Sequence, residues 1–199
     1  MKKLLFVSLF LFITLPLYAD SDPIFTTQVG VDSSTEALEV IDYEHHEIHA
    51  GSHYIIASSD VLGSGITKDF CTYAPDTTKW IHIIFEVAGS ASTSFDVFEA
   101  GDFDDDGISS TPLNSNRNSS NTAGFGVSAD CTVNSTGTRI LNYRFGSGTN
   151  PSKALSGENR SRTELVLKQD TNYLWRIRSN AADNNVTYVG SWYEHVDKN

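Results

Sequence analysis

Hydrophobic and polar residues alternate with a period of two along much of the chain. In residues 79–87, Ile81, Ile83 and Phe85 fall on one side of an extended chain, and Trp80 and His82 fall on the other. Because the side chains of a strand point to opposite faces in turn, this alternation predicts a strand with one buried face.

The same alternation recurs in further segments, which are separated by clusters of turn-forming residues. These segments are residues 93–101, 138–145, 163–169, 172–179 and 185–196. No stretch has a helical stripe longer than two turns. Residues 34–48 are the best helical candidate, and they suit a strand as well.

The pattern predicts an all-β fold of about eight to ten short strands. We favour a two-sheet β-sandwich of jelly-roll type, with an immunoglobulin-like sandwich as the alternative. Two long connections interrupt the strands: residues 107–124 are rich in Asn and Ser, and residues 146–161 are rich in Gly and Ser. Connections of this length are usually functional or mobile.

The first nineteen residues have the pattern of a secretory signal peptide. Lys2 and Lys3 precede an apolar stretch that is too short to span a bilayer, and Ala19 ends an acceptable cleavage site. We therefore predict a signal peptide over residues 1–19 and a single β-sandwich domain over residues 20–199. The protein is expected in the periplasm, outside the cell or on its surface, without a membrane anchor after cleavage.

The chain is acidic, with a formal net charge of −11 that becomes more negative when Lys2 and Lys3 are removed. Such a surface repels phosphate backbones, so nucleic acid is excluded as a partner class. It attracts cations and keeps an exported or assembling protein soluble.

The two cysteines, Cys71 and Cys131, are the only ones in the sequence. In an oxidising compartment they can form a disulfide that closes a long loop. The alternative is two separate buried thiols, because spacing alone does not show that the two residues approach each other.

A histidine-rich segment, EHHEIHAGSHY, covers residues 44–54. On a strand, His45, Glu47 and His49 would share one face and supply two ligands to a metal ion, with His82 or His195 as the third. The segment matches none of the zinc-peptidase spacings. The alternative, which we favour, is that these histidines hydrogen-bond within the fold.

An acidic segment, DFDDDG, places Asp102, Asp104 and Asp106 before Gly107. This is the opening of a calcium-binding loop, in which alternate carboxylates converge on the ion. The glutamate expected at the twelfth position is replaced by Leu113. Calcium is therefore a candidate cofactor, and a solvated acidic turn is the alternative. Nucleophile-elbow, phosphate-loop and dinucleotide-binding motifs are absent from the sequence, so we expect no enzymatic activity.

Several blocks together resemble a family of small β-rich proteins encoded beside capsid genes in tailed phages. The blocks are EHHEIHAGSHY, PDTTKWIHIIFEV, FEAG with DGISSTPLNSNRNSS, and LKQDTNYLWRIRSNAADNNVTYVGSWYEH. By this resemblance Asn116, Arg117 and Asn118 form one signature, and the closing WYEH of residues 192–195 forms another.

The resemblance implies a non-enzymatic virion structural component of head-decoration or head-fibre type, which assembles with other protein subunits in a capsid or surface lattice. The predicted signal peptide and the cysteine pair depart from that pattern, because phage heads assemble in the cytoplasm. An exported, surface-displayed member fits both features.

A secreted carbohydrate-binding or adhesion module is the alternative function. It would use exposed aromatic rings to stack against sugars, with calcium at the acidic segment. The candidates for stacking are Trp80, Trp175, Trp192 and Tyr193.

Overall fold

The computed structural model describes residues 43–146, 157–160 and 163–196, with only the backbone described for residues 157–160. The predicted signal peptide lies outside the described residues, as does most of the Gly/Ser-rich connection. No helix in the described part of the chain is long and apolar enough to cross a membrane.

The predicted all-β fold is confirmed. After one short helix, α1 (Tyr43–Ala50), the described chain forms strands only. These are β1 (His53–Leu62), β2 (Thr67–Ala74), β3 (Lys79–Gly89), β4 (Thr93–Glu99), β5 (Asp102–Asp105), β6 (Ile108–Ser110), β7 (Leu113–Asn114), β8 (Gly126–Ala129), β9 (Thr132–Ser135), β10 (Thr138–Phe145), β11 (Gly157–Arg160), β12 (Leu165–Leu167), β13 (Thr171–Ser179) and β14 (Asn184–Val196).

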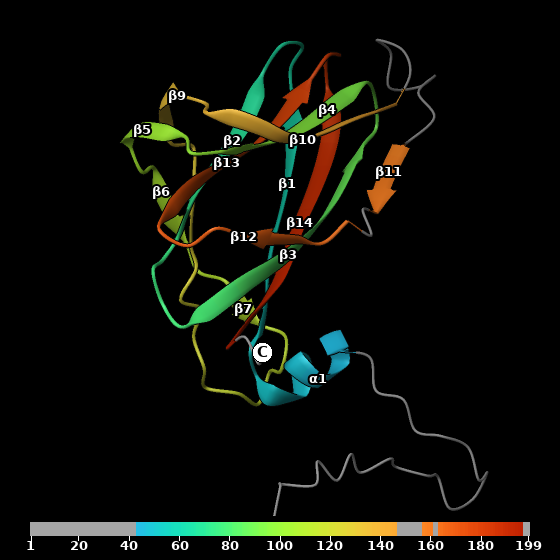
Figure 1. Cartoon of the computed structure of the whole chain (residues 1–199). Helices are drawn as coiled ribbons and strands as arrows, with labels where there is room; N and C mark the ends of the chain where they lie inside the picture. Colours follow the sequence, from blue (N-terminus) through green and yellow to red (C-terminus); the bar gives the residue numbers. More distant parts are fainter. Residues whose placement is uncertain (1–42, 147–156, 161–162, 197–199) are drawn as a thin grey trace, which may run out of the picture. The chain divides into compact units, whose positions relative to one another are not determined.

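The strands form two large antiparallel sheets that pack as a sandwich (Figure 1). The first sheet has the order β11-β3-β14-β1-β7, with β12 also paired to β3. The second has the order β10-β4-β13-β2-β8-β6, and β5 pairs with β9 in a small separate ribbon. Sequence neighbours such as β3 and β4 lie in different sheets, so most pairings join distant segments. The jelly-roll arrangement stays a prediction.

Aromatic side chains fill the space between the two sheets. The Phe85 ring meets the Trp175 ring nearly edge-on at a centroid distance of 5.1 Å, and Phe125 meets Trp192 in the same way at 5.4 Å. Phe70 stacks on Tyr188 at 4.6 Å. Each large ring removes much apolar area from water, so these contacts hold the two sheets together.

The alternation that predicted β3 is confirmed by burial. Ile81, Ile83, Phe85 and Val87 are at most 4% exposed, and the residues between them are half-buried. In β13 the inward residues are Tyr173, Trp175 and Ile177, as the same pattern predicted.

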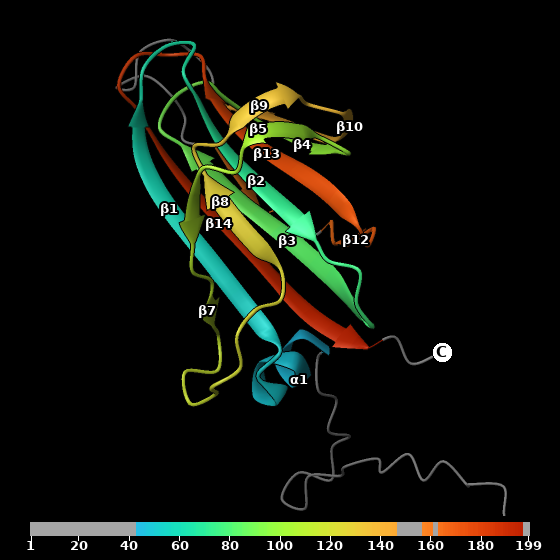
Figure 2. The ribbon, with the colours of Figure 1, turned by 90° about the vertical axis from the view of Figure 1, so that its left-hand side faces the viewer.

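The strand geometry in which His45, Glu47 and His49 would share one face is not formed, because this segment is α1. The helix ends where Gly51 takes a left-handed backbone with φ of 71° and its amide bonds to the carbonyl of Ile48 at 3.1 Å. The following strand, β1, starts only two residues later. In Figures 1 and 2, α1 lies beside the first residues of β1.

The Asn/Ser-rich connection is partly regular. It contributes β6 to the edge of the second sheet, beside β8, and β7 to the edge of the first sheet, beside β1. Asn114 of β7 is buried, and its amide donates to the carbonyls of Gly51 and Asn121 at 2.9 and 3.2 Å. This segment therefore links the edges of both sheets.

Candidate functional site

Helix α1 separates the three residues of the first histidine group. His45 and His49 are exposed and one helical turn apart, and their Nε2 atoms are 2.8 Å from each other. Glu47 points the other way and is 5% exposed. Burial alone would raise the pKa of Glu47, but hydrogen bonds from Ser52 and His46, together with the nearby histidine charges, outweigh it and hold the pKa below its ordinary value.

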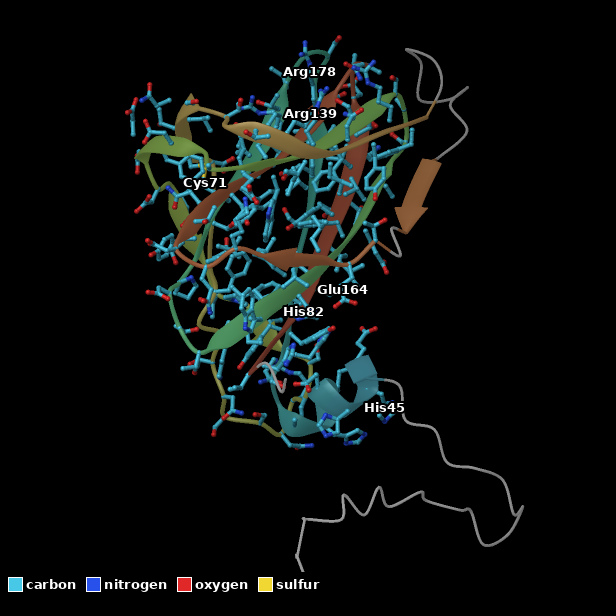
Figure 3. The ribbon with its side chains drawn as sticks, viewed as in Figure 1. His45, Cys71, His82, Arg139, Glu164 and Arg178 are labelled. Atoms are coloured by element: carbon cyan, nitrogen blue, oxygen red, sulfur yellow. A yellow bond between two sulfur atoms is a disulfide. The ribbon has the colours of Figure 1, made fainter. Side chains whose placement is uncertain are left out.

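A second histidine group, which we call the His82 cluster, lies on the outer side of the first sheet. It comprises His82 of β3, Glu164, and Tyr193 and His195 of β14. Figure 3 labels His82 and Glu164. The His82 ring stacks on Tyr193 at 4.7 Å, and its Nδ1 lies 2.5 Å from Glu164 Oε1, which also accepts a hydrogen bond from the Tyr193 hydroxyl. The Nε2 atoms of His82 and His195 are 2.8 Å apart.

The two rings also contact neighbouring polar groups. Nδ1 of His82 lies 3.1 Å from the Tyr193 hydroxyl, and Nδ1 of His195 lies 3.1 Å from the Val196 carbonyl. The 2.8 Å contact between the two Nε2 atoms fits a hydrogen bond in which one ring nitrogen carries the proton and the other accepts it.

The predicted metal ligands are therefore not brought together. His82 and His195 contact each other instead of supplying a third ligand to His45 and His49. The described residues contain no group of three or more histidine, cysteine, aspartate or glutamate side chains placed to hold a metal ion. Zinc sites use three or four protein ligands, so this geometry does not support a zinc site at residues 45–49.

The acidic segment forms strand β5 and a turn. Asp102 accepts a hydrogen bond from Asn134 at 2.6 Å, while Asp104 and Asp106 are exposed, and the three carboxylates form no metal-holding group in the described structure. Gly107 has φ of 79°, and a side chain there would clash with the backbone of Cys131. The backbone conformation of this turn therefore explains why position 107 is a glycine. The arrangement of the three carboxylates gives calcium binding no support.

The aromatic residues predicted to bind sugar are mostly buried. Trp175 and Trp192 are 0% exposed and pack in the core, and Tyr193 is 6% exposed because the His82 ring stacks on it. Trp192 and Tyr193, the two residues predicted to bind a ligand, therefore present no exposed ring for stacking. Trp80 is half-buried on the outer face.

The disulfide between Cys71 and Cys131 is confirmed. It joins β2 to the turn between β8 and β9, with the two Cα atoms 6.1 Å apart and the two residues 60 positions apart in sequence. In the chain-entropy account, a loop of this length stabilises the fold by about 4 kcal/mol.

The outer face of the first sheet carries a surface that we call the apolar face. Cross-strand partners line up in rows: Ile84 with Ser191 and Ile55, and Ala88 with Thr187 and Ser59. Its apolar members are Ile55, Ala57, Val61, Ile84, Ala88, Leu113 and Val189. In these rows of β1, β14 and β3, Glu86 is the one described residue with a charged side chain.

Some residues of these sites carry only a weak signal in the sequence. The alternation of residues 163–169 puts Glu164 on the polar side of a strand, but nothing local pairs it with His82. The alternation of residues 172–179 likewise puts Arg176 and Arg178 together on the polar side of β13.

No protein-family model matches the chain, and a comparison with curated proteins finds no match.

Proposed function

We propose that this protein is a non-enzymatic structural subunit, exported and displayed on a surface, that acts by contact with other protein subunits. The resemblance to phage proteins suggests a component of head-decoration or head-fibre type. The observation that carries the proposal is the apolar face on the first sheet.

The apolar face differs from the rest of this acidic molecule. Isoleucine, valine and alanine side chains occupy neighbouring positions on three strands, next to small hydroxyl residues. Val61 is 65% exposed and Leu113 is 51% exposed. Core regions of protein interfaces are depleted in charge, and contiguous exposed apolar surface marks interaction sites. Another copy of the chain is the partner we test first.

The disulfide supports the exported location. Disulfides persist in oxidising compartments and are rare in the cytoplasm. The bond between Cys71 and Cys131 constrains the edge of the second sheet, so a protein that works outside the cytoplasm gains stability from it.

Measuring mass in solution tests the proposal. The full chain, produced with its own leader and purified in oxidised form, should elute in light-scattering chromatography as an assembly larger than one chain. Val189→Arg and Ile84→Glu place a charge in the centre of the apolar face and should return the protein to monomers. Thr132→Arg on exposed β9 is the matched control and should leave the assembly intact.

Circular dichroism should show the same strand content in all three variants. A native protein that stays monomeric at high concentration would overturn self-assembly through this face, and so would central variants that assemble like the native chain.

A further inference from the structure

The outer face of the second sheet is hollowed at the end away from α1. The hollow has a volume of about 590 Å³ and is lined by residues of β4, β10, β13 and the start of β2. Four arginines surround it: Arg139, Arg144, Arg176 and Arg178. Figure 3 labels Arg139 and Arg178, which both lie toward this end of the sandwich. We call this site the arginine hollow.

Strand register explains why these arginines meet. Arg144 of β10 and Arg178 of β13 are both paired with Ser94 of β4, one from each side. Neighbouring strands are about 4.8 Å apart, so the two arginine backbones stand about 10 Å apart across one row. Their guanidinium groups can reach a common ligand above Ser94.

The next row is neutralised within the protein. Arg176 makes a bidentate pair with Asp69, through two contacts of 2.7 Å, and this pair raises the pKa of Arg176. Arg139, which pairs with Phe98 further along β4, also lies 3.5 Å from Asp96. These carboxylates fix two of the arginines in place, and a bidentate guanidinium pair is strong and directional.

The first row has no such partners. Among the described residues, no ion pair involves Arg144 or Arg178, and both side chains are exposed. The chain has a net charge of −11, so two unpaired guanidinium groups that face one hollow create a local region of positive potential on an acidic protein. Their mutual repulsion is relieved when an anionic group binds between them.

The remaining lining indicates what carries the anionic group. Ser92, Thr67 and Asn180 bring hydroxyl and amide groups to the rim, and the half-buried ring of Phe98 adds an apolar wall. Hydroxyl-rich ligands with apolar ring faces use this combination of hydrogen-bonding groups and aromatic carbon.

The floor of the hollow is held rigidly. The buried amide of Asn184 donates to Thr93 Oγ1 at 2.8 Å and accepts from the Ala91 amide at 2.9 Å. It thereby fixes the turn that carries Ser92 and Thr93. A site with fixed donors loses less entropy on binding than a flexible one.

We propose that the arginine hollow binds an acidic saccharide, with a sulfate or carboxylate group held between Arg144 and Arg178 and a sugar ring of the same chain against Phe98. This inference does not depend on the assembly proposed above, because it concerns the opposite face of the sandwich.

Calorimetric titration of the full, oxidised chain tests the site. The probes are a sulfated dextran oligosaccharide, an oligogalacturonate, uncharged dextran of the same length, and inorganic sulfate. At least one acidic oligosaccharide should bind, more weakly as salt increases, and uncharged dextran should not. The double variant R144Q/R178Q should bind it about tenfold more weakly or worse, since two charge-assisted contacts are lost.

Arg117→Gln, an exposed arginine in the Asn/Ser-rich segment, is the matched control and should bind like the native chain. The melting temperature of each variant shows that it is folded. Failure of both acidic oligosaccharides to bind the native chain would overturn the proposal, and so would full binding by the double variant. Inorganic sulfate that binds as tightly as the sugar would overturn the saccharide assignment and leave a simple anion site.

Discussion

The carboxylate of Glu194 accepts hydrogen bonds from the backbone amides of both Gly124 and Phe125 at 3.0 Å. It also accepts one from the indole of Trp192 at 3.2 Å, and the Glu194 residue is only 5% exposed. A buried acid on β14 thus anchors the end of the Asn/Ser-rich segment, where Phe125 enters the core. This acid is part of the closing WYEH block, and its role in the fold is structural.

Replacing Glu194 by Ala should lower the free energy of unfolding by about 3 kcal/mol, because the change leaves two backbone amides and an indole N–H without an acceptor. Glu194→Gln should cost less, since one carbonyl oxygen remains. Urea denaturation followed by tryptophan fluorescence measures the change. Asp104→Asn, at an exposed carboxylate, is the control and should stay within about 0.5 kcal/mol of the native chain. Equal stability of Glu194→Ala and the native protein would contradict the anchoring role.

Tyr188 carries a buried hydroxyl that has no hydrogen-bond partner among the described residues. Burial raises the pKa of this group well above its ordinary value. Tyr188→Phe should keep the stack on Phe70 and remove the unsatisfied oxygen, so we expect the free energy of unfolding to rise by about 1 kcal/mol. The melting temperature should then increase by about 2–4 °C.

Tyr54→Phe is the matched control for this prediction. The Tyr54 hydroxyl donates to the Thr122 carbonyl at 3.1 Å, so its removal should lower stability by about 1 kcal/mol. If both substitutions lowered the melting temperature equally, the hydroxyl of Tyr188 would have to be satisfied in the folded protein.

His53 should make the fold less stable in mild acid. Burial lowers its pKa below the ordinary 6.5, and the charges of Glu44 and Glu47 only partly offset this effect. Above 6.5 the ring is neutral in both states, and its contribution to stability is complete. As the pH falls below 6.5, the unfolded chain takes up the proton before the folded chain does, so stability declines until the pH reaches the lower folded value.

Denaturation midpoints measured between about pH 7.5 and pH 5 test this sign. His53→Gln should flatten the decline relative to the native protein, because the group that titrates differently is gone. His49→Gln, at the exposed end of α1, should leave the decline as steep as in the native chain. A native protein that becomes more stable as the pH falls over this interval, while the His53 variant does not, would reverse the assignment.

Period-two patterns predicted the strands well where one face is fully buried. Each inward residue of β3 meets the core, so burial and sequence agree. Helix α1 lies mostly within residues 34–48, which suited either a helix or a strand, because its eight residues have no apolar stripe that decides between the two. Its end depends on Gly51 and on the contact between Ser52 and Glu47. Such short helices are decided by tertiary contacts rather than by pattern.

The site residues could be predicted only in part, because they depend on which strands are neighbours. His82 and His195 are 113 residues apart and meet only because β3 pairs with β14. Arg144 and Arg178 face each other across Ser94 only because β4 separates β10 from β13. The spacing of residues along the chain does not encode this order, whereas two cysteines in a chain predicted to be exported indicated the disulfide.

The two sheets are stacked, so the apolar face and the arginine hollow look in opposite directions. A chain that adheres through the first necessarily turns the second toward the surroundings. If many chains were fixed side by side through the apolar face, their arginine hollows would form a dense array of sites. A long polymer that is bound at several sites dissociates far more slowly than one bound at a single site. Modest affinity at each hollow would then suffice for lasting attachment.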